Sequence, residues 1–284
     1  MKIDGRILAT LIEQQLKKHI TELNITPHLA VVLVGNNLNS LSFIKQKQQA
    51  AKRIGIKLTF FHFPENEVSN ALSELKKLAH NPHVHAIIVQ RPIPAQNPLL
   101  FTQLTPKTKD VDGFRQDSPY VTPVAQAVIE MLKEIYFSHI KNEHKPTELF
   151  SSDFVDWLTT QNITLVGRGD TAGKPIHALL EKHLIPHQIV GHDTKDKENM
   201  IRQADIIISA VGKKDLIQNR FLKRGCILIG VGISSENGHM YGDYFSHSIQ
   251  DTAAYFTSTP GGIGPVNVAC LMRNVVQAAT KYTS

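Results

Sequence analysis

The sequence predicts an α/β fold with parallel sheets. Two continuous apolar runs, residues 29–35 and 226–233, stand among shorter ones, and helix-like stretches separate them along the chain. Such runs are typical of strands that are buried on both faces, as in parallel sheets. Strands that alternate with helices favour an α/β architecture. With 284 residues, the chain is long enough for two domains or one large one.

The first half of the chain alternates between helical and extended patterns. Apolar residues at helical spacing predict a helix at the start, and Gly55 follows a later helix as its C-cap. The predicted elements are a helix over 6–23, a strand over 29–35, a helix over 39–54, a strand over 57–63, a helix over 67–80 and a strand over 85–90. A proline-rich loop then leads to the turn-rich segment 110–114.

The second half begins with a connector helix over 122–136, because Thr122 and Pro123 supply an N-cap and a first-turn proline. A polar, irregular stretch over 137–152 follows. The remaining predicted elements are a short helix over 153–160, strands over 162–167, 188–191, 204–212 and 226–233, and a final helix after the glycine loop 260–264.

Composition and charge exclude several protein classes. An apolar content of 42% argues against disorder, and no apolar run has the length of a membrane span. The N-terminus carries acids inside an amphipathic pattern, so we do not expect a signal peptide. Cys226 and Cys270 lie in apolar runs, so we expect buried thiols and no metal site. The net charge of +6 comes from lysines scattered beside acids, which favours a solvated surface over nucleic-acid binding and also suits an anionic substrate or cofactor.

A glycine-containing turn follows the strand over 162–167 and opens a helix. Gly167 and Gly169 permit a tight turn, and Arg168 adds positive charge beside the free N–H groups of the helix. Gly173 falls one residue late for the dinucleotide fingerprint, so an ordinary turn remains the alternative. Asp193 lies at the end of the next predicted strand. An acid there can bind a ribose hydroxyl of a dinucleotide, and an equally good alternative is that it caps a helix.

Three further segments are candidates for chemistry. Ser40, Phe43 and Lys47 share one helical face, although an isolated lysine is usually solvated. The segment 110–114 has the pattern of a structural Asx turn. The glycine-rich segment 260–267 suits a close approach of the backbone to a ligand, or a plain loop.

Taken together and in order, these segments resemble the bifunctional methylenetetrahydrofolate dehydrogenase/cyclohydrolase family over nearly the whole chain. The matching motifs are the VG–x4–S–x2–YV–x2–K block at 34–47, VQLPLP at 89–94, KDVDGF at 109–114, VGRS–x2–VGKP at 166–175 and PGGVGPMT at 260–267. The resemblance implies two α/β domains around a cleft. Residues 1–122 with 260–284 would bind folate, and residues 123–259 would form a Rossmann-like dinucleotide-binding domain.

The resemblance also implies the reaction. Such enzymes oxidise 5,10-methylenetetrahydrofolate to the 5,10-methenyl form with NADP and hydrolyse the product to 10-formyltetrahydrofolate. Lys47 matches the family's catalytic lysine, Gln90 the residue that holds it, and Asp112 the acid that binds the pterin. By the same matching, Phe43, Pro92, Gly262 and Pro265 would contact folate, and Gly167, Arg168, Gly169, Asp193 and Ile233 the dinucleotide. A cytoplasmic homodimer without nucleic-acid or membrane partners is implied as well.

Several positions depart from the family pattern. Phe43 replaces a tyrosine, Arg91 a leucine, and Gly169 a serine, and further changes stand at 120–121, 191–193, 230–232 and 266–267. These changes leave two alternatives open: a relative with one activity or another folate or nucleotide preference, and a non-catalytic folate- or nucleotide-binding protein. For the cofactor, an Asp193 that caps a helix leaves Arg168 to select NADP, whereas an Asp193 in the site favours NAD; we expect NADP.

Overall fold

The computed structural model describes residues 1–236 and 239–281, which form two compact units. We call residues 10–123 with 268–284 the N-terminal unit, and residues 1–9 with 124–267 the central unit. Residues 1–9 belong to the central unit because strand β1 (Lys2–Ile3) pairs there with β11 (Tyr255–Thr257), and Gly5 N donates to Gly261 O at 2.9 Å. The sequence-based division differs here, because it assigns residues 1–9 and 260–267 to the first domain.

The N-terminal unit is built on a three-stranded parallel sheet in the order β3-β2-β4. Its elements are β2 (His28–Val34), α2 (Leu38–Ile54), β3 (Lys57–Phe63), α3 (Val68–His80), β4 (Ala86–Val89) and α4 (Leu99–Leu104). Two long helices, α1 (Gly5–Glu22) and α10 (Ile263–Thr280), contribute most of their length to this unit.

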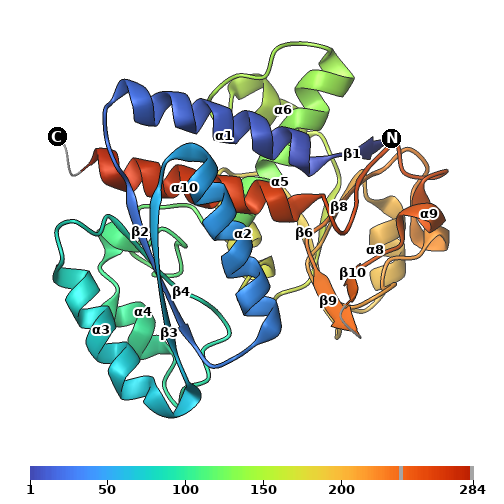
Figure 1. Cartoon of the computed structure of the whole chain (residues 1–284). Helices are drawn as coiled ribbons and strands as arrows, with labels where there is room; N and C mark the ends of the chain where they lie inside the picture. The colour runs from blue at the N-terminus through green and yellow to red at the C-terminus, as the bar shows by residue number, and fades with distance from the viewer. Residues whose placement is uncertain (237–238, 282–284) are drawn as a thin grey trace. The chain divides into compact units, whose positions relative to one another are not determined.

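Helices cover both faces of this sheet, which explains the unbroken apolar run of β2. Ala30, Val32 and Val34 pack against Leu75 of α3 and Phe101 of α4. The alternate residues of β2 point to the opposite face, on the side where Figure 1 shows α1, α2 and α10. All six residues from 29 to 34 are therefore buried.

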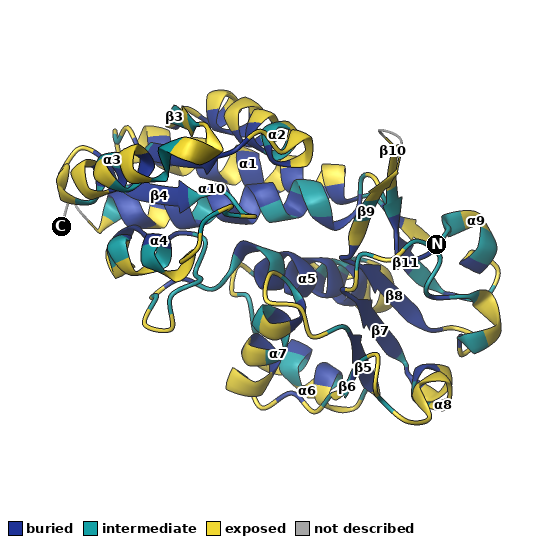
Figure 2. Cartoon of the chain, turned by 90° about the horizontal axis from the view of Figure 1, so that it is seen from below, coloured by how far each residue is buried: buried dark blue, intermediate teal, exposed yellow. Residues whose placement is uncertain are grey.

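The central unit contains a six-stranded parallel sheet in the order β6-β5-β7-β8-β11-β1. Its remaining elements are α5 (Pro123–Glu134), a π-helix (Ile135–Lys141), α6 (Ser152–Thr159), β5 (Ile163–Val166), α7 (Gly173–Lys182), β6 (Gln188–Val190), α8 (Lys197–Gln203), β7 (Ile206–Ser209), β8 (Ile227–Gly230), β9 (Ile233–Glu236), β10 (His239–Gly242) and α9 (Ser246–Ile249). Strands β5, β7 and β8 are buried, whereas the outer faces of α6 and α8 are exposed (Figure 2).

Each sheet reverses its strand order beside one strand, β5 in the central unit and β2 in the N-terminal unit. From β5, the chain goes to β6 on one side and to β7 on the other, and from β2 it goes to β3 and then to β4. Ligands of open parallel sheets bind at the carboxyl ends of the strands at such a switch point. The first such point carries the turn at Gly167, and the second carries Gly35 and Gln90, so the α/β prediction is confirmed with a Rossmann-like central unit.

Most predicted helices and strands are present, with two corrections. The polar stretch 137–152 is not irregular throughout, because a π-helix continues α5 as far as Lys141. The strand predicted over 226–233 ends at Gly230, and Ile233 starts the antiparallel hairpin of β9 and β10. Polar residues in β9 hid this hairpin from an analysis based on apolar runs.

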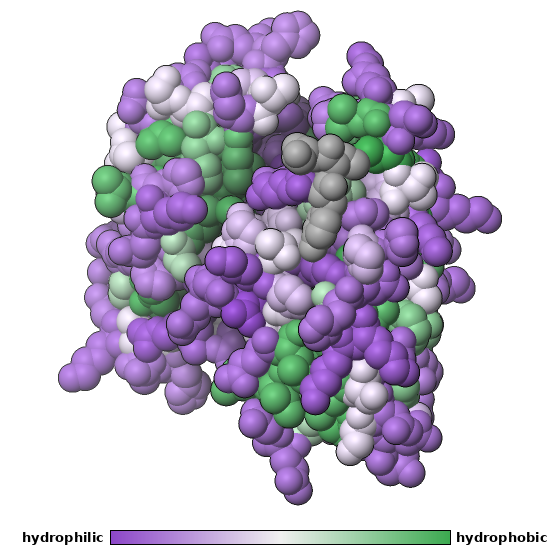
Figure 3. Space-filling view, turned by 90° about the vertical axis from the view of Figure 1, so that its left-hand side faces the viewer, coloured by the Kyte–Doolittle hydropathy of each residue, from purple (hydrophilic) through white to green (hydrophobic). Residues whose placement is uncertain are grey.

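Hydrophilic residues dominate the face of the protein that Figure 3 shows. On the face in Figure 3, hydrophobic residues form separate patches among hydrophilic ones. Lysines lie next to acids, as in the pairs Lys18–Glu22 at 3.7 Å and Lys77–Glu74 at 3.1 Å. Among the described residues, no helix combines the length and apolarity that crossing a bilayer requires.

Candidate functional site

Helix α2 carries Lys47 on its buried face. The side chain of Asn37 accepts a hydrogen bond from Ser40 N and caps the helix at its start, and Gly55 ends it in the left-handed conformation. Ser40, Ile44 and Lys47 are buried because residues three to four apart share one helical face. The side chain of Lys47 is therefore not the solvated lysine that a single helical position usually implies.

Lys47 and Gln90 contact each other directly. Lys47 Nζ donates to Gln90 Oε1 at 2.8 Å, and Gln90 Nε2 donates to the carbonyl oxygen of Arg91 at 3.0 Å. Ser40 Oγ donates to the same carbonyl oxygen at 3.2 Å. The residue after β4 is thus joined to two residues of α2, and the predicted Lys47–Gln90 pair is present in the structure.

Burial lowers the pKa of Lys47 from its ordinary value of 10.5, and the charge of Asp112 opposes that shift. An ammonium group loses its hydration when it is buried, so the neutral amine is favoured. Gln90 offers a carbonyl oxygen, which binds an N–H of the amine without adding a negative charge. The arrangement is suited to a lysine that accepts and returns a proton near neutral pH.

The loop after α4 carries two carboxylates. Asp110 and Asp112 line a small cavity with Arg91 and Phe114. Arg91 stacks on Phe114, with its guanidinium carbon 4.3 Å from the ring centre, and donates to Thr102 Oγ1 at 3.3 Å. Arg91, which replaces the leucine of the family pattern, is therefore held beside Asp112 by Phe114, an aromatic residue of the 109–114 motif.

Asp110 is a site residue that the sequence analysis did not single out. It is 5% exposed and accepts a hydrogen bond from Arg115 N at 2.9 Å. Burial, with a smaller contribution from the charge of Asp112, raises the pKa of Asp110 to about 6. Its position two residues before Asp112 was the only available signal, because sequence does not reveal which carboxylate of a turn is buried.

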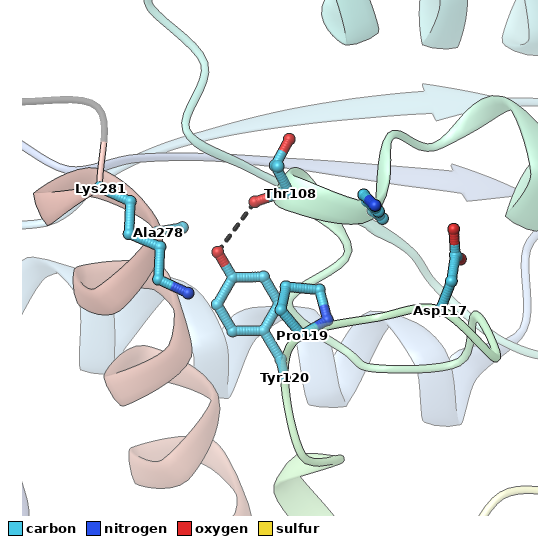
Figure 4. Close-up of a pocket in the computed structure, with 7 residues that line it drawn as sticks. Thr108, Asp117, Pro119, Tyr120, Ala278 and Lys281 are labelled. Carbon is cyan, nitrogen blue, oxygen red and sulfur yellow. Dashed lines mark hydrogen bonds between the residues drawn. The ribbon is translucent and has the colours of Figure 1, made fainter.

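A second hollow, of about 360 Å³, is lined by residues of this loop and by Ala278 and Lys281 at the end of α10. Figure 4 shows Tyr120 between Thr108 and Lys281, and Tyr120 Oη donates to Thr108 O at 2.9 Å. Lys109 Nζ donates to the carbonyl oxygens of Leu78 at 3.2 Å and Asn81 at 2.7 Å. The first contact joins the two ends of the segment that carries Asp110 and Asp112, and the Lys109 contacts tie its start to the end of α3.

The other predicted folate contacts divide between the two units. Phe43 lies half-buried on α2, and Pro92 is exposed after a cis peptide bond that follows Arg91. Gly262 and Pro265 belong to the central unit, where a side chain at Gly262 would lie within 2.6 Å of Ser258 O. Contact of these residues with folate stays a prediction.

The glycine turn between β5 and α7 is formed by close backbone packing. A Cβ atom at Gly167 would lie 2.5 Å from Ala210 O, and one at Gly173 would lie 2.3 Å from Gly167 O. Gly173 therefore performs the helix-packing role of a fingerprint glycine despite its late position. At Gly169 no atom lies within 4 Å of a Cβ position, so a serine would fit there. The turn leaves room for a phosphate-bearing ligand, as a dinucleotide site requires.

Arg168 and Asp193 meet beside this turn. Arg168 Nη1 lies 3.2 Å from Asp193 Oδ1, and Arg168 Nη2 donates to Thr194 Oγ1 at 3.3 Å. Asp193 does not cap a helix, because α8 starts at Lys197 after Asp196. The helix-cap alternative for Asp193 is therefore wrong, and its carboxylate lies at the predicted cofactor site.

A buried aspartate of the central unit, Asp243, holds the loop that follows β7. Asp243 is fully buried and accepts hydrogen bonds from Ser209 Oγ at 2.7 Å, Val211 N at 3.0 Å and Lys213 N at 2.8 Å. A Cβ atom at Gly232 would lie 2.3 Å from Asp243 Oδ2, which explains that glycine. Ile233 follows it, with its carbonyl oxygen 2.9 Å from a Cβ position at Gly212. The sequence offered no signal for Asp243, which lies far along the chain from its partners.

Comparison with protein families identifies both parts of the chain. Residues 3–112 match the catalytic-domain model of tetrahydrofolate dehydrogenase/cyclohydrolase, and residues 147–283 match the NAD(P)-binding-domain model of the same family. The bifunctional protein FolD of Nautilia profundicola is 32% identical over 286 residues, covering 99% of this chain and 97% of the relative. The bifunctional protein FolD of Anoxybacillus flavithermus is 34% identical over 284 residues, covering 98% and 96%.

A solved structure supports the same assignment. The crystal structure of the bifunctional methylenetetrahydrofolate dehydrogenase/cyclohydrolase FolD from Campylobacter jejuni superposes with a TM-score of 0.85 at 28% identity. The alignment covers 99% of each chain.

Proposed function

The chain belongs to the tetrahydrofolate dehydrogenase/cyclohydrolase family, and we propose that Lys47, Gln90 and Asp112 bind and hydrolyse its folate substrate. The protein is an enzyme with two activities. It oxidises 5,10-methylenetetrahydrofolate to 5,10-methenyltetrahydrofolate with NADP, and it hydrolyses that product to 10-formyltetrahydrofolate. The 2.8 Å contact between Lys47 Nζ and Gln90 Oε1 carries the proposal for the site.

In the oxidation, the dinucleotide supplies a hydride acceptor for the methylene carbon of the folate. The protein's part is to bind and orient. The positive end of the α7 helix dipole lies at the glycine turn with Arg168 beside it, and both suit the phosphates of the dinucleotide. Gly167 permits the close backbone packing of that turn, Gly169 leaves space beside it, and Asp193 lies at Arg168. Ile233 is proposed as a further contact of the dinucleotide.

In the hydrolysis, the oxygen of a water molecule forms a bond with the methenyl carbon, and Lys47 accepts the proton that the water loses. Lys47 then returns that proton to the folate nitrogen as the bond between this nitrogen and the carbon breaks. The remaining proton of the added water leaves to solvent as the carbon–oxygen double bond forms, and the formyl group stays on the other nitrogen. Burial lowers the pKa of Lys47 and so favours its neutral amine, and Gln90 accepts a hydrogen bond from its Nζ.

Asp112 and Phe43 position the folate in this proposal. The carboxylate of Asp112 accepts hydrogen bonds from N–H groups of the pterin, and the ring of Phe43 stacks on the aminobenzoyl group. The place of Asp112 on the wall of a small cavity supports the first role. The half-buried ring of Phe43 on the face of α2 that carries Lys47 supports the second.

The preference for NADP depends on the exposed pair of Arg168 and Asp193. Their side chains are 52% and 77% exposed, so the ion pair contributes little to stability. The 2′-phosphate of NADP would replace the Asp193 carboxylate on Arg168 at small cost. Asp193 nevertheless repels that phosphate and suits the ribose diol of NAD, so we propose NADP as the preferred cofactor with a reduced margin over NAD.

The family resemblance further supports a cytoplasmic homodimer that associates through the central unit. Light scattering of the purified protein tests the dimer, and fractionation of the producing cells tests the location. A monomer at micromolar concentration would contradict the first point.

An assay at two wavelengths tests the two activities together. One wavelength follows the reduced dinucleotide and the other follows methenyltetrahydrofolate, with methylenetetrahydrofolate as the substrate. Formation of reduced cofactor followed by decay of the methenyl signal is expected. If methenyltetrahydrofolate accumulates and decays only at its uncatalysed rate, the hydrolase activity is excluded. If neither signal changes, both activities are excluded.

A further inference from the structure

A cluster of two histidines and a glutamate lies on the central unit, away from the glycine turn. His177 and Glu181 come from α7, and His187 precedes β6. One ligand atom from each of the three residues lies within 4.8 Å of the others. The two histidines are half-buried and the glutamate is exposed, so the cluster is accessible to solvent.

The backbone holds these three residues in place. His177 and Glu181 are one helical turn apart and therefore share a face of α7. After the helix, Leu184 adopts a left-handed conformation, and Ile185 N donates to Leu180 O at 3.0 Å. This closed turn, with buried Ile185 as its anchor, brings His187 back beside the last turn of α7.

The hydrogen bonds of His187 define which of its nitrogens is available. Its Nδ1 lies 2.8 Å from the carbonyl oxygen of Ile185, which only accepts, so Nδ1 carries a proton. Its Nε2 then has a free lone pair and faces His177 Nδ1 at 2.8 Å. A histidine that donates its other N–H to a backbone carbonyl is the usual arrangement of a metal ligand, because that bond fixes the tautomer and the ring orientation.

We propose that His177, Glu181 and His187 bind a divalent transition metal ion, with Zn²⁺ as the ion of choice. His187 Nε2, His177 Nδ1 and a carboxylate oxygen of Glu181 are the ligands, and water completes the coordination. Two imidazole nitrogens and one carboxylate form a ligand set that suits Zn²⁺, Ni²⁺ or Cu²⁺, whereas Mg²⁺ and Ca²⁺ prefer oxygen ligands.

Binding requires a small adjustment of the two rings. Two nitrogens on a tetrahedral Zn²⁺, each at about 2.0–2.1 Å, lie about 3.3 Å apart. The rings therefore separate by about half an ångström from the 2.8 Å contact. The proton between them moves from Nδ1 to Nε2 of His177, so that both rings bind as neutral imidazoles. The ion would join the end of α7 to the start of β6 and stabilise the segment that also carries the glycine turn.

Cobalt binding to protein without an affinity tag tests the proposal. Co²⁺ serves as a visible probe of nitrogen and oxygen coordination, and Zn²⁺ is then added as its competitor. The variants are His177→Gln, Glu181→Gln and His187→Gln. His80→Gln is the matched control, because His80 is an exposed helical histidine in the other unit whose Nδ1 lies 2.8 Å from Lys76 O. Such a control is needed in a chain with 14 histidines.

We expect one equivalent of Co²⁺ to bind to the native protein and to His80→Gln, and Zn²⁺ but not excess Mg²⁺ to displace it. Each of the three site variants should weaken binding by at least about tenfold. Zn²⁺ should also raise the Tm of the native protein and not that of His187→Gln. Undiminished binding in both histidine variants, or in Glu181→Gln, would overturn the assignment, as would the absence of binding to the native protein.

Discussion

Gln90 accepts a hydrogen bond of 2.8 Å from Nζ of Lys47 and, through its own amide nitrogen, donates one of 3.0 Å to the Arg91 carbonyl oxygen. The second bond fixes the orientation of the amide, so its oxygen rather than its nitrogen faces Lys47. A buried amine that is held by a neutral acceptor keeps its lowered pKa, whereas a carboxylate in the same place would favour the ammonium form. The pair thus combines a defined position with a lowered pKa, and both suit a lysine that transfers protons.

Replacement of Lys47 by methionine should abolish the hydrolase activity and leave dinucleotide binding unchanged. A general acid–base group contributes about 10²–10⁴-fold to a rate, and methionine fills a similar volume without a proton to transfer. Decay of methenyltetrahydrofolate measures the effect. Lys45→Met is the control, because Lys45 is exposed on the same helix. Hydrolysis within about threefold of the native rate would contradict a catalytic role for Lys47.

Replacement of Gln90 by glutamate should move the pH dependence of hydrolysis. The added carboxylate favours the ammonium form and raises the pKa of Lys47, so a higher pH is needed for the neutral amine. The rising limb of kcat against pH should therefore shift to higher pH, with a lower rate at neutral pH. A merely structural Gln90 would lower the rate equally at every pH, and that result would contradict its contact with the catalytic amine.

Replacement of Phe43 by tyrosine should raise hydrolysis relative to oxidation. The new hydroxyl adds a hydrogen bond near Lys47 while the ring keeps its stacking surface. A hydrogen bond worth about 0.5–1.5 kcal/mol changes the ratio of the two rates by about 2- to 12-fold. The two-wavelength assay gives both rates in one sample. An unchanged ratio would mean that a hydroxyl has no role at this position.

Replacement of Asp193 by serine should increase the preference for NADP. The carboxylate beside Arg168 repels the 2′-phosphate, and its loss leaves Arg168 free to bind that group. Because the pair is exposed, the ratio of kcat/KM for NADP to that for NAD should rise by up to about fivefold. Glu198→Gln, which changes an exposed acid on α8, is the control. A constant ratio would show that Asp193 does not affect the choice, and a falling ratio would contradict repulsion between its carboxylate and the 2′-phosphate.

Replacement of Asp110 by asparagine should stabilise the protein above pH 6. The folded-state pKa of Asp110 is about 6, above its ordinary 3.8, so the folded state holds the proton more tightly than the unfolded state. Ionisation therefore lowers the free energy of unfolding as the pH rises from about 4 to 6, by up to about 3 kcal/mol. Asparagine still accepts from Arg115 N. Urea unfolding of both proteins at pH 4 and pH 7.5 measures the free energy of unfolding that the substitution adds at each pH. If this gain is the same at both pH values, the ionisation of a buried Asp110 is contradicted.

The sequence by itself determined the elements and the side chains that face inward. Hydrophobic periodicity reports whether a residue points to a core, and Gly55 marks a helix end because a left-handed residue is needed there. That was sufficient for the alternation of strands and helices. It did not show that Lys47 is buried on α2, because an isolated lysine on a helix is usually solvated. The family motifs added the identity of Lys47, Gln90 and Asp112, since each motif is continuous in the chain.

Only the tertiary structure decided which distant residues meet. Lys47 and Gln90 touch because β2 and β4 are neighbours, and Asp193 reaches Arg168 because β5 pairs with β6. Burial of Asp110 depends on the packing of its loop, which no local pattern encodes. The reason is that periodicity depends on near neighbours along the chain, whereas the distances and pKa values of a site depend on the order in which strands assemble.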